Sequence, residues 1–154
     1  MKWHLSARLL ILFLLFVFAA DAAAQRNVTP AIDRDPVLEA DAKKNLDVAW
    51  QGFGPAKKAY KQVLLRFEET YAAYPDFSKV DEFLYLAGMS SYYLSKNEGK
   101  QKVDLKIERE REKYSPEKLR EDAVAYLSLM LEKNPESQYR SNAEKVLKEL
   151  REDQ

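Results

Sequence analysis

The side chains that most often carry out nucleophilic and metal chemistry are almost absent from this sequence. Its 154 residues include no cysteine and a single histidine, His4. His4 lies in a leading segment of distinct composition. The rest of the chain therefore contains neither cysteine nor histidine. Thiol nucleophiles, disulfides, zinc sites built from cysteine and histidine, and histidine-based catalytic triads are therefore excluded.

The remaining candidates for chemistry are carboxylates, lysines and serines, and their pattern is not that of an active site. The acidic residues lie on amphipathic surfaces beside cationic neighbours, so no pair suited to general acid and base catalysis stands out. No glycine-rich phosphate loop occurs, and no dense acidic loop suited to a metal ion. A hydrolase built from Ser, Lys, Asp and Glu is kept as an alternative, although no positioned nucleophile and base can be named. We expect no enzymatic activity, no cofactor and no metal site.

The charge balance argues against nucleic-acid binding. The chain has 25 Lys and Arg against 25 Asp and Glu. A surface that neutralises phosphates needs a clear excess of cations. With 46% hydrophobic residues, the chain can bury a core. We therefore expect a binding or scaffolding protein with no nucleic-acid partner.

The first 24 residues predict an export signal. Lys2, His4 and Arg8 precede an unbroken apolar run over 9–20, and a small-residue stretch ending at Ala24 follows. This order is typical of a secretory signal peptide. The apolar run would form a helix about 18 Å long, short of the roughly 30 Å bilayer core, so an uncleaved anchor is the weaker alternative. We expect cleavage after Ala24. Because no cysteine lies near that point, we expect no lipid anchor, and membrane association only through a partner.

Start signals for helices follow a flexible leader expected over residues 25–34. Asp-Pro at 35–36 and Ser-Pro at 115–116 each supply a cap and a proline at the first helical position. Ser78 and Asp81 form a capping box that predicts another start. We expect one helical domain over residues 35–152.

Apolar residues at spacings of three and four define the expected helices. The clearest period begins at Ala56 and ends before Pro75. The helix over 83–94 is apolar nearly all round, so we expect it to be covered on two sides and to form the centre of the fold. No strand-like alternation occurs. The fold class is therefore all-α, with about five to six helices.

The segment over 98–114 interrupts this pattern. Eleven of its seventeen residues are charged. We interpret it as a charged excursion, either a solvated helix or a mobile segment. A partner-docking arm is the alternative.

One helix-proline-helix unit occurs twice in the chain. Superimposing Pro135 on Pro75 pairs Leu64 with Val124 and Phe67 with Leu127. Each unit leaves an apolar stripe that it cannot bury alone, so stacking into a short solenoid is the physical solution. The separation of 60 residues exceeds the roughly 34 of a tetratricopeptide repeat. The extra residues between the two copies are accounted for by the charged excursion.

The residues of this unit resemble a known repeat. Leu-Tyr-Leu-Ala-Gly-Met-Ser-Ser-Tyr-Tyr over 84–93 resembles the first helix of a tetratricopeptide repeat, with Gly88 at the position where two helices approach closely. The helix carrying Ala123, Leu127 and Met130, ended by Pro135, resembles the second. The resemblance implies a short tetratricopeptide-like helical-hairpin solenoid.

A more specific resemblance links the chain to an envelope family. Phe-Glu-Glu-Thr-Tyr-Ala-Ala-Tyr-Pro-Asp-Phe-Ser over 67–78, with Asn-Pro-Glu-Ser over 134–137, resembles the BamD-like family of outer-membrane assembly proteins. It covers about residues 38–150. It implies a non-enzymatic periplasmic protein-protein adaptor in outer-membrane protein assembly or envelope biogenesis. An envelope-organising binding module unrelated to outer-membrane insertion is the alternative.

The chain also departs from this family. BamD is a lipoprotein with more repeats, whereas this sequence has no cysteine for lipid attachment and length for two repeats and a capping helix. Membrane attachment therefore does not carry over from the resemblance.

The tetratricopeptide pattern also suggests a partner-binding face. In such repeats the positions matching Glu82, Tyr85, Met89, Tyr92 and Tyr93 usually face the concave groove. Aromatic and methionine side chains offer flat, adaptable contact area to an extended peptide or a partner helix. We therefore predict that these five residues bind a protein or peptide of the cell envelope. Ordinary core packing beneath the charged excursion is the alternative.

Overall fold

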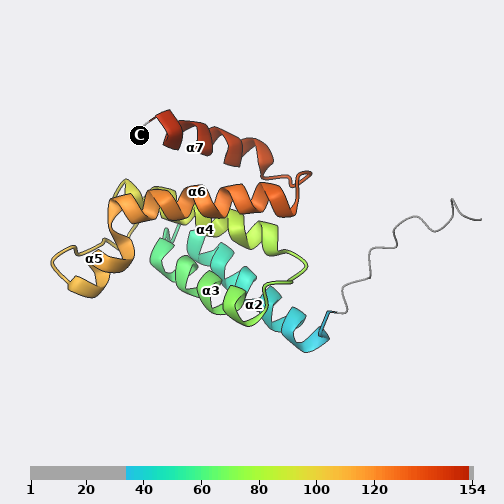
Figure 1. Ribbon diagram of the computed structural model, residues 1–154. Helices are drawn as coiled ribbons and strands as arrows, with labels where there is room; N and C mark the ends of the chain where they lie inside the picture. The colour runs from blue at the N-terminus through green and yellow to red at the C-terminus, as the bar shows by residue number, and fades with distance from the viewer. Residues whose placement is uncertain (1–33, 153–154) are drawn as a thin grey trace, which may run out of the picture. The chain divides into compact units, whose positions relative to one another are not determined.

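The computed structural model describes residues 34–152, and this part of the chain is all-helical (Figure 1). The helices are α2 (Pro36–Phe53), α3 (Tyr60–Ala73), α4 (Val80–Ser95), α5 (Glu108–Tyr114), α6 (Pro116–Lys133) and α7 (Arg140–Glu152). The prediction of an all-α fold is confirmed. The signal peptide and all but the last residue of the expected leader lie outside the described residues, so both stay predictions. Across residues 34–152, no helix has the length and apolarity needed to cross a membrane.

Two of the expected helix starts are confirmed by their caps. The Asp35 carboxylate accepts hydrogen bonds from the backbone N–H groups of Val37 and Leu38, at 2.8 and 3.3 Å. The Ser115 hydroxyl accepts from the N–H of Lys118 at 3.4 Å. Each cap satisfies a donor that the first helical turn leaves unpaired, which is worth about 1 kcal/mol.

The expected starts of the second and third helices are wrong. α3 begins at Tyr60 and not at Ala56, because residues 54–59 form a turn in which Lys58 has a φ of 45°. α4 begins at Val80, and its cap residue makes no side-chain hydrogen bond. The backbone N–H of Ser78 donates instead to the Glu39 carboxylate, at 3.3 Å to each oxygen. The predicted capping box is therefore not formed.

The predicted repeat is visible in the backbone. The chain leaves α3 and enters α4 through the same pair of turns by which it leaves α6 and enters α7. Four backbone N–H donors and their carbonyl acceptors recur 60 positions apart: Tyr74 to Thr70, Phe77 to Tyr74, Val80 to Phe77 and Phe83 to Lys79, matched by Asn134 to Met130, Ser137 to Asn134, Arg140 to Ser137 and Ala143 to Tyr139.

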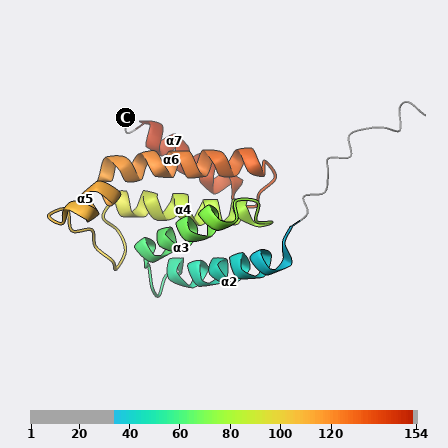
Figure 2. The ribbon, with the colours of Figure 1, turned by 60° about the horizontal axis from the view of Figure 1, so that its bottom comes forward.

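α4 is the central helix, as predicted. Every residue from 83 to 92 is buried, because α3 and α6 cover it from two sides (Figure 2) and α2 and α7 also contact it. Leu84, Leu86 and Ala87 have no exposed surface. Since burial of apolar surface is the main driving force of folding, α4 contributes the centre of the hydrophobic core of this domain.

Gly88 lies where α4 meets α6, which confirms its expected role. A Cβ atom at position 88 would lie 2.6 Å from Leu127 Cγ. Such a separation is far inside van der Waals contact. The two helices can therefore pack at this distance only because position 88 has no side chain beyond a hydrogen atom.

The charged excursion has two parts. Residues 96–107 form turns and irregular backbone, and only α5 is helical. α5 has acidic residues in its first turn and basic residues in its last, an order that complements the helix dipole. The backbone N–H of Lys100 donates to the carbonyl of Lys58 at 3.0 Å, so the irregular part lies against the turn before α3.

Candidate partner-binding site

The packed helical hairpins are offset from the helix-proline-helix units. α2 pairs with α3 and α4 pairs with α6, so α2 and α4 are the first helices of the two hairpins, and α7 is the next first helix in the chain. We call their shared surface the first-helix face. Three of the five predicted site residues of α4, Glu82, Tyr85 and Tyr93, contact residues of α2 there.

Glu82 links all three first helices. Its Oε1 accepts a hydrogen bond from Trp50 Nε1 of α2 at 2.6 Å, and another from the Tyr139 hydroxyl, just before α7, at 3.2 Å. Its Oε2 lies 3.7 Å from Lys79 Nζ. The Glu82 side chain is 19% exposed, so solvent still reaches the carboxylate.

Three aromatic rings pack around this carboxylate. Tyr85 and Tyr139 stack with centroids 4.4 Å apart and planes 14° apart. The Trp50 ring lies 5.9 Å from Tyr139 and 6.5 Å from Tyr85. Asn142 Nδ2 donates to the Tyr85 hydroxyl at 2.5 Å. We call Trp50, Glu82, Tyr85 and Tyr139 the Trp50 cluster.

A second aromatic group continues the face along α2 and α4. Phe53 lies 5.9 Å from Trp50, 5.6 Å from Tyr60 and 6.1 Å from Tyr93. Tyr60 and Tyr93 stack at 5.2 Å. Aromatic pairs at these separations are favourable beyond the area they bury. Through the contact between Trp50 and Phe53, the two groups form one continuous set of aromatic rings.

Tyr92 contributes to a polar link between α4 and α7. The Lys96 ammonium donates to the Tyr92 hydroxyl at 2.6 Å and to the Glu149 carboxylate. The hydrogen bond with Glu149 raises the pKa of Lys96, and the same bond lowers the pKa of Glu149. Both groups therefore stay charged near neutral pH.

The environment of Tyr139 favours its neutral form. Burial, followed by the neighbouring charge of Glu82, raises the pKa of Tyr139 to about 12. The hydroxyl therefore remains a donor to Glu82 across the physiological pH range.

Burial separates the five predicted site residues into two groups. Met89, Tyr85 and Tyr92 are buried, with 2, 7 and 8% of their surface exposed. Glu82 and Tyr93 are partly exposed. Hydrogen bonds link Tyr85 to Asn142 of α7, and Tyr92 to Glu149 of α7 through Lys96. The binding role of the five stays a prediction, and Glu82 and Tyr93 are the members accessible for direct contact.

Sequence reasoning did not find Trp50 and Tyr139. Both are partly exposed, and both donate to Glu82 across 32 and 57 residues of sequence. Helical spacing groups residues within one helix only, so the sequence contains no signal that joins these two to α4. In residues 34–152, no set of three or more His, Asp or Glu side chains is arranged to hold a metal ion.

Comparison with known proteins identifies a family. The model of the YfiO family, described as outer membrane lipoprotein, matches residues 22–153. No curated protein and no solved structure matches the chain. Because the family is described as lipoproteins, the match does not support the expectation that this chain has no lipid anchor. That expectation, based on the absence of cysteine, stays a prediction.

The match includes both copies of the helix-proline-helix unit and the whole first-helix face. It also includes the segments over 67–78 and 134–137 that resemble the BamD-like family. The chain therefore belongs to the YfiO, or BamD-like, family of outer membrane lipoproteins.

Proposed function

We propose that this protein is a non-enzymatic periplasmic adaptor that binds a protein partner during outer-membrane protein assembly. Family membership supports the place of action. The Trp50 cluster, in which three helices share one partly exposed carboxylate, is the observation that carries the binding role.

The cluster has the chemistry of a peptide-binding surface. Trp50 and Tyr139 present partly exposed rings that are already fixed by packing, so little side-chain entropy is lost on contact. Glu82 Oε1 is used by two ring donors, whereas Oε2 has only a 3.7 Å contact with Lys79. Oε2 is therefore available to accept from a backbone N–H of an extended peptide.

The function is tested by replacing Glu82 in cells depleted of the wild-type protein. Glu82→Arg places a cation beside Lys79 and removes the acceptor of Trp50 and Tyr139. We expect a severalfold loss of folded outer-membrane β-barrel proteins, measured by their heat-modifiable mobility on gels.

The matched control is Glu121→Arg on α6. Glu121 is exposed, and its carboxylate makes no hydrogen bond or ion pair with the described residues. It should support normal assembly. If depletion of the protein itself leaves the folded fraction unchanged, the proposal fails and the envelope-organising role is favoured. Circular dichroism verifies that Glu82→Arg remains helical.

A further inference from the structure

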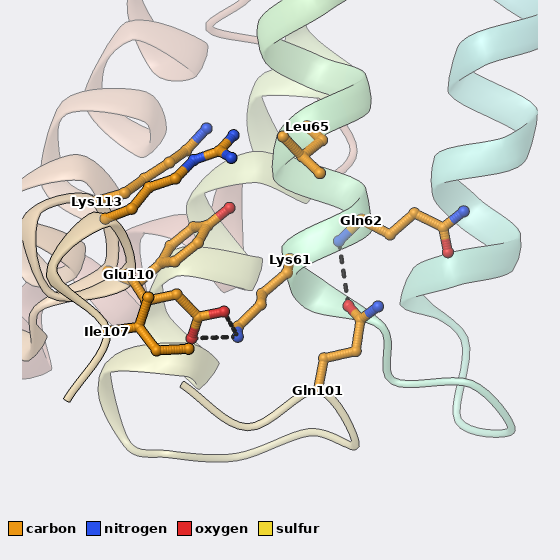
Figure 3. A pocket seen from close by; sticks show the side chains of 9 residues that line it. Lys61, Gln62, Leu65, Gln101, Ile107, Glu110 and Lys113 are labelled. Atoms are coloured by element: carbon orange, nitrogen blue, oxygen red, sulfur yellow. Dashed lines mark hydrogen bonds and ion pairs between the residues drawn. The ribbon is translucent and has the colours of Figure 1, made fainter. Parts of the chain in front are cut away.

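A second surface of this domain, away from the Trp50 cluster, has the features of a binding pocket. A cavity of about 700 Å³ lies between α3 and the charged excursion. Figure 3 shows Ile107, Glu110 and Lys113 on one side of it, with Leu65 and Gln62 of α3 on the other. We call it the α3–α5 cavity.

The walls of the α3–α5 cavity leave large apolar side chains uncovered. Leu65 is 42% exposed and Ile107 is 51% exposed. They are two of the five exposed large hydrophobic residues among residues 34–152, and both line this one cavity. The Tyr114 ring also lines it. Single exposed apolar residues need no explanation, but a group around a cavity offers a site for an apolar side chain of a ligand.

The cavity is formed before any ligand binds. Lys61 Nζ donates to the Lys102 carbonyl at 2.6 Å and to both Glu110 oxygens at 2.8 and 2.9 Å. The backbone N–H of Gln62 donates to Gln101 Oε1 at 3.2 Å (Figure 3). These bonds fix both walls relative to each other. Binding therefore requires little ordering of the protein.

The charges around the α3–α5 cavity select the sign of the ligand. Three cations, Lys61, Arg109 and Lys113, line it with one carboxylate, Glu110. Lys61 pairs with Glu110, and Lys113 pairs with Glu68. The exposed Arg109 guanidinium makes no ion pair or side-chain hydrogen bond with the part of the chain described here. One cation thus remains for a ligand, and guanidinium groups bind carboxylates through two parallel hydrogen bonds.

We propose that the α3–α5 cavity docks an acidic peptide segment of a partner protein. A large apolar side chain of that segment packs between Leu65 and Ile107, and a neighbouring Asp or Glu pairs with Arg109. No residue that lines this cavity belongs to the Trp50 cluster, and the inference goes beyond the proposed adaptor site.

An array of random twelve-residue peptides, probed with the labelled full-length protein, tests this proposal. The wild-type protein should select peptides that combine Asp or Glu with a large apolar residue. Arg109→Glu should weaken binding of the selected peptides about tenfold or more, because it replaces the guanidinium with a like charge. The double variant Leu65→Ser, Ile107→Ser should weaken it severalfold through loss of apolar contact.

Arg151→Glu is the matched control. Arg151 is an exposed cation of α7 that lines a different cavity, so its reversal should leave binding to the same peptides unchanged. Because Arg109, Leu65, Ile107 and Arg151 are all exposed, the variants should retain the wild-type circular dichroism spectrum.

Three results would overturn the proposal. The first is selection of no peptide above background, and the second is selection without enrichment in acidic residues. The third is equal binding of the selected peptides by the wild-type protein and Arg109→Glu. Some selected peptides could bind Arg109→Glu as well as the wild-type protein and fail to bind Glu82→Arg. Such peptides would bind at the first-helix face, and they count as this third result.

Discussion

The side chain at position 88 is a single hydrogen atom that faces Leu127 of α6. Alanine there would bring a Cβ to 2.6 Å from Leu127 Cγ and 3.3 Å from the Leu127 backbone nitrogen. Leu127 has no exposed surface, so its side chain cannot move out into solvent to make room. At the scale of one residue, the contact between the two central helices depends on this glycine.

Gly88→Ala should therefore destabilise the domain. Overpacking a core typically costs about 1–3 kcal/mol, which exceeds the roughly 1 kcal/mol that alanine gains in helix propensity. The measurement is the free energy of unfolding in urea. Gly54→Ala is the control, because its Cβ would meet nothing closer than 3.6 Å. Greater stability of Gly88→Ala would show that the helix contact has been misplaced.

Glu82→Gln should lower the pKa of Tyr139 from about 12 toward its ordinary value of 10.0. The negative carboxylate disfavours the phenolate, so removing its charge makes ionisation easier. Burial remains, so the shift should be partial. NMR titration of the Tyr139 ring carbon that bears the hydroxyl measures it. Glu136→Gln, which replaces an exposed acid nearby in sequence, should have no effect. An unchanged Tyr139 pKa in Glu82→Gln would show that the two side chains do not interact in solution.

At the scale of elements, the sequence predicted the helix caps and turns that are formed by residues close together in the chain. The caps at Asp35 and Ser115 and the doubled turn around Pro75 and Pro135 depend on residues close to one another in the chain. The predicted capping box at the start of α4 does not form, because the backbone N–H of Ser78 donates to Glu39, a residue far away in sequence. The Trp50 cluster was missed for the same reason: three helices must pack before Trp50, Glu82 and Tyr139 meet.

The excursion is joined to α3 mainly through Lys61. Lys61→Met removes three hydrogen bonds, to Lys102 and to both oxygens of Glu110, and should loosen residues 98–107. We expect severalfold faster cleavage by trypsin at the lysines of this segment, read by mass spectrometry. Lys57→Met, at an exposed lysine of the preceding turn, is the control. Equal cleavage rates in the two variants would contradict this role of Lys61.

The same link should depend on pH in a defined direction. The hydrogen bonds from Lys61, followed by that from the Asp104 backbone, lower the pKa of Glu110 below its ordinary value of 4.5. A carboxyl group with a lowered pKa stabilises the folded state above its unfolded pKa, and this contribution is lost as the pH falls through the folded value. Carbon NMR of the Glu110 carboxyl should show a midpoint below 4.5 that rises in Lys61→Met. A midpoint that is the same in both proteins would contradict the hydrogen bond.

At the scale of the whole domain, the first-helix face is the surface that joins the two ends of the described chain through its central helix. α2, α4 and α7 each contribute to it, and α7 turns a charged outer side to solvent, as expected of a helix that caps a solenoid. The central claim is that this face binds a protein engaged in outer-membrane assembly. Tyr93 and Tyr139 are its partly exposed tyrosines, whereas Tyr126 is a partly exposed tyrosine of α6, a second helix.

Photo-crosslinking in intact cells tests this claim most directly. Each of the three tyrosines is replaced in turn by p-benzoylphenylalanine, which preserves an aromatic ring, and the crosslinked proteins are identified by mass spectrometry. The account predicts that positions 93 and 139 capture a component of outer-membrane protein assembly or an unfolded outer-membrane protein, and that position 126 does not. Capture of such proteins from position 126 alone, or equally from all three positions, would contradict it.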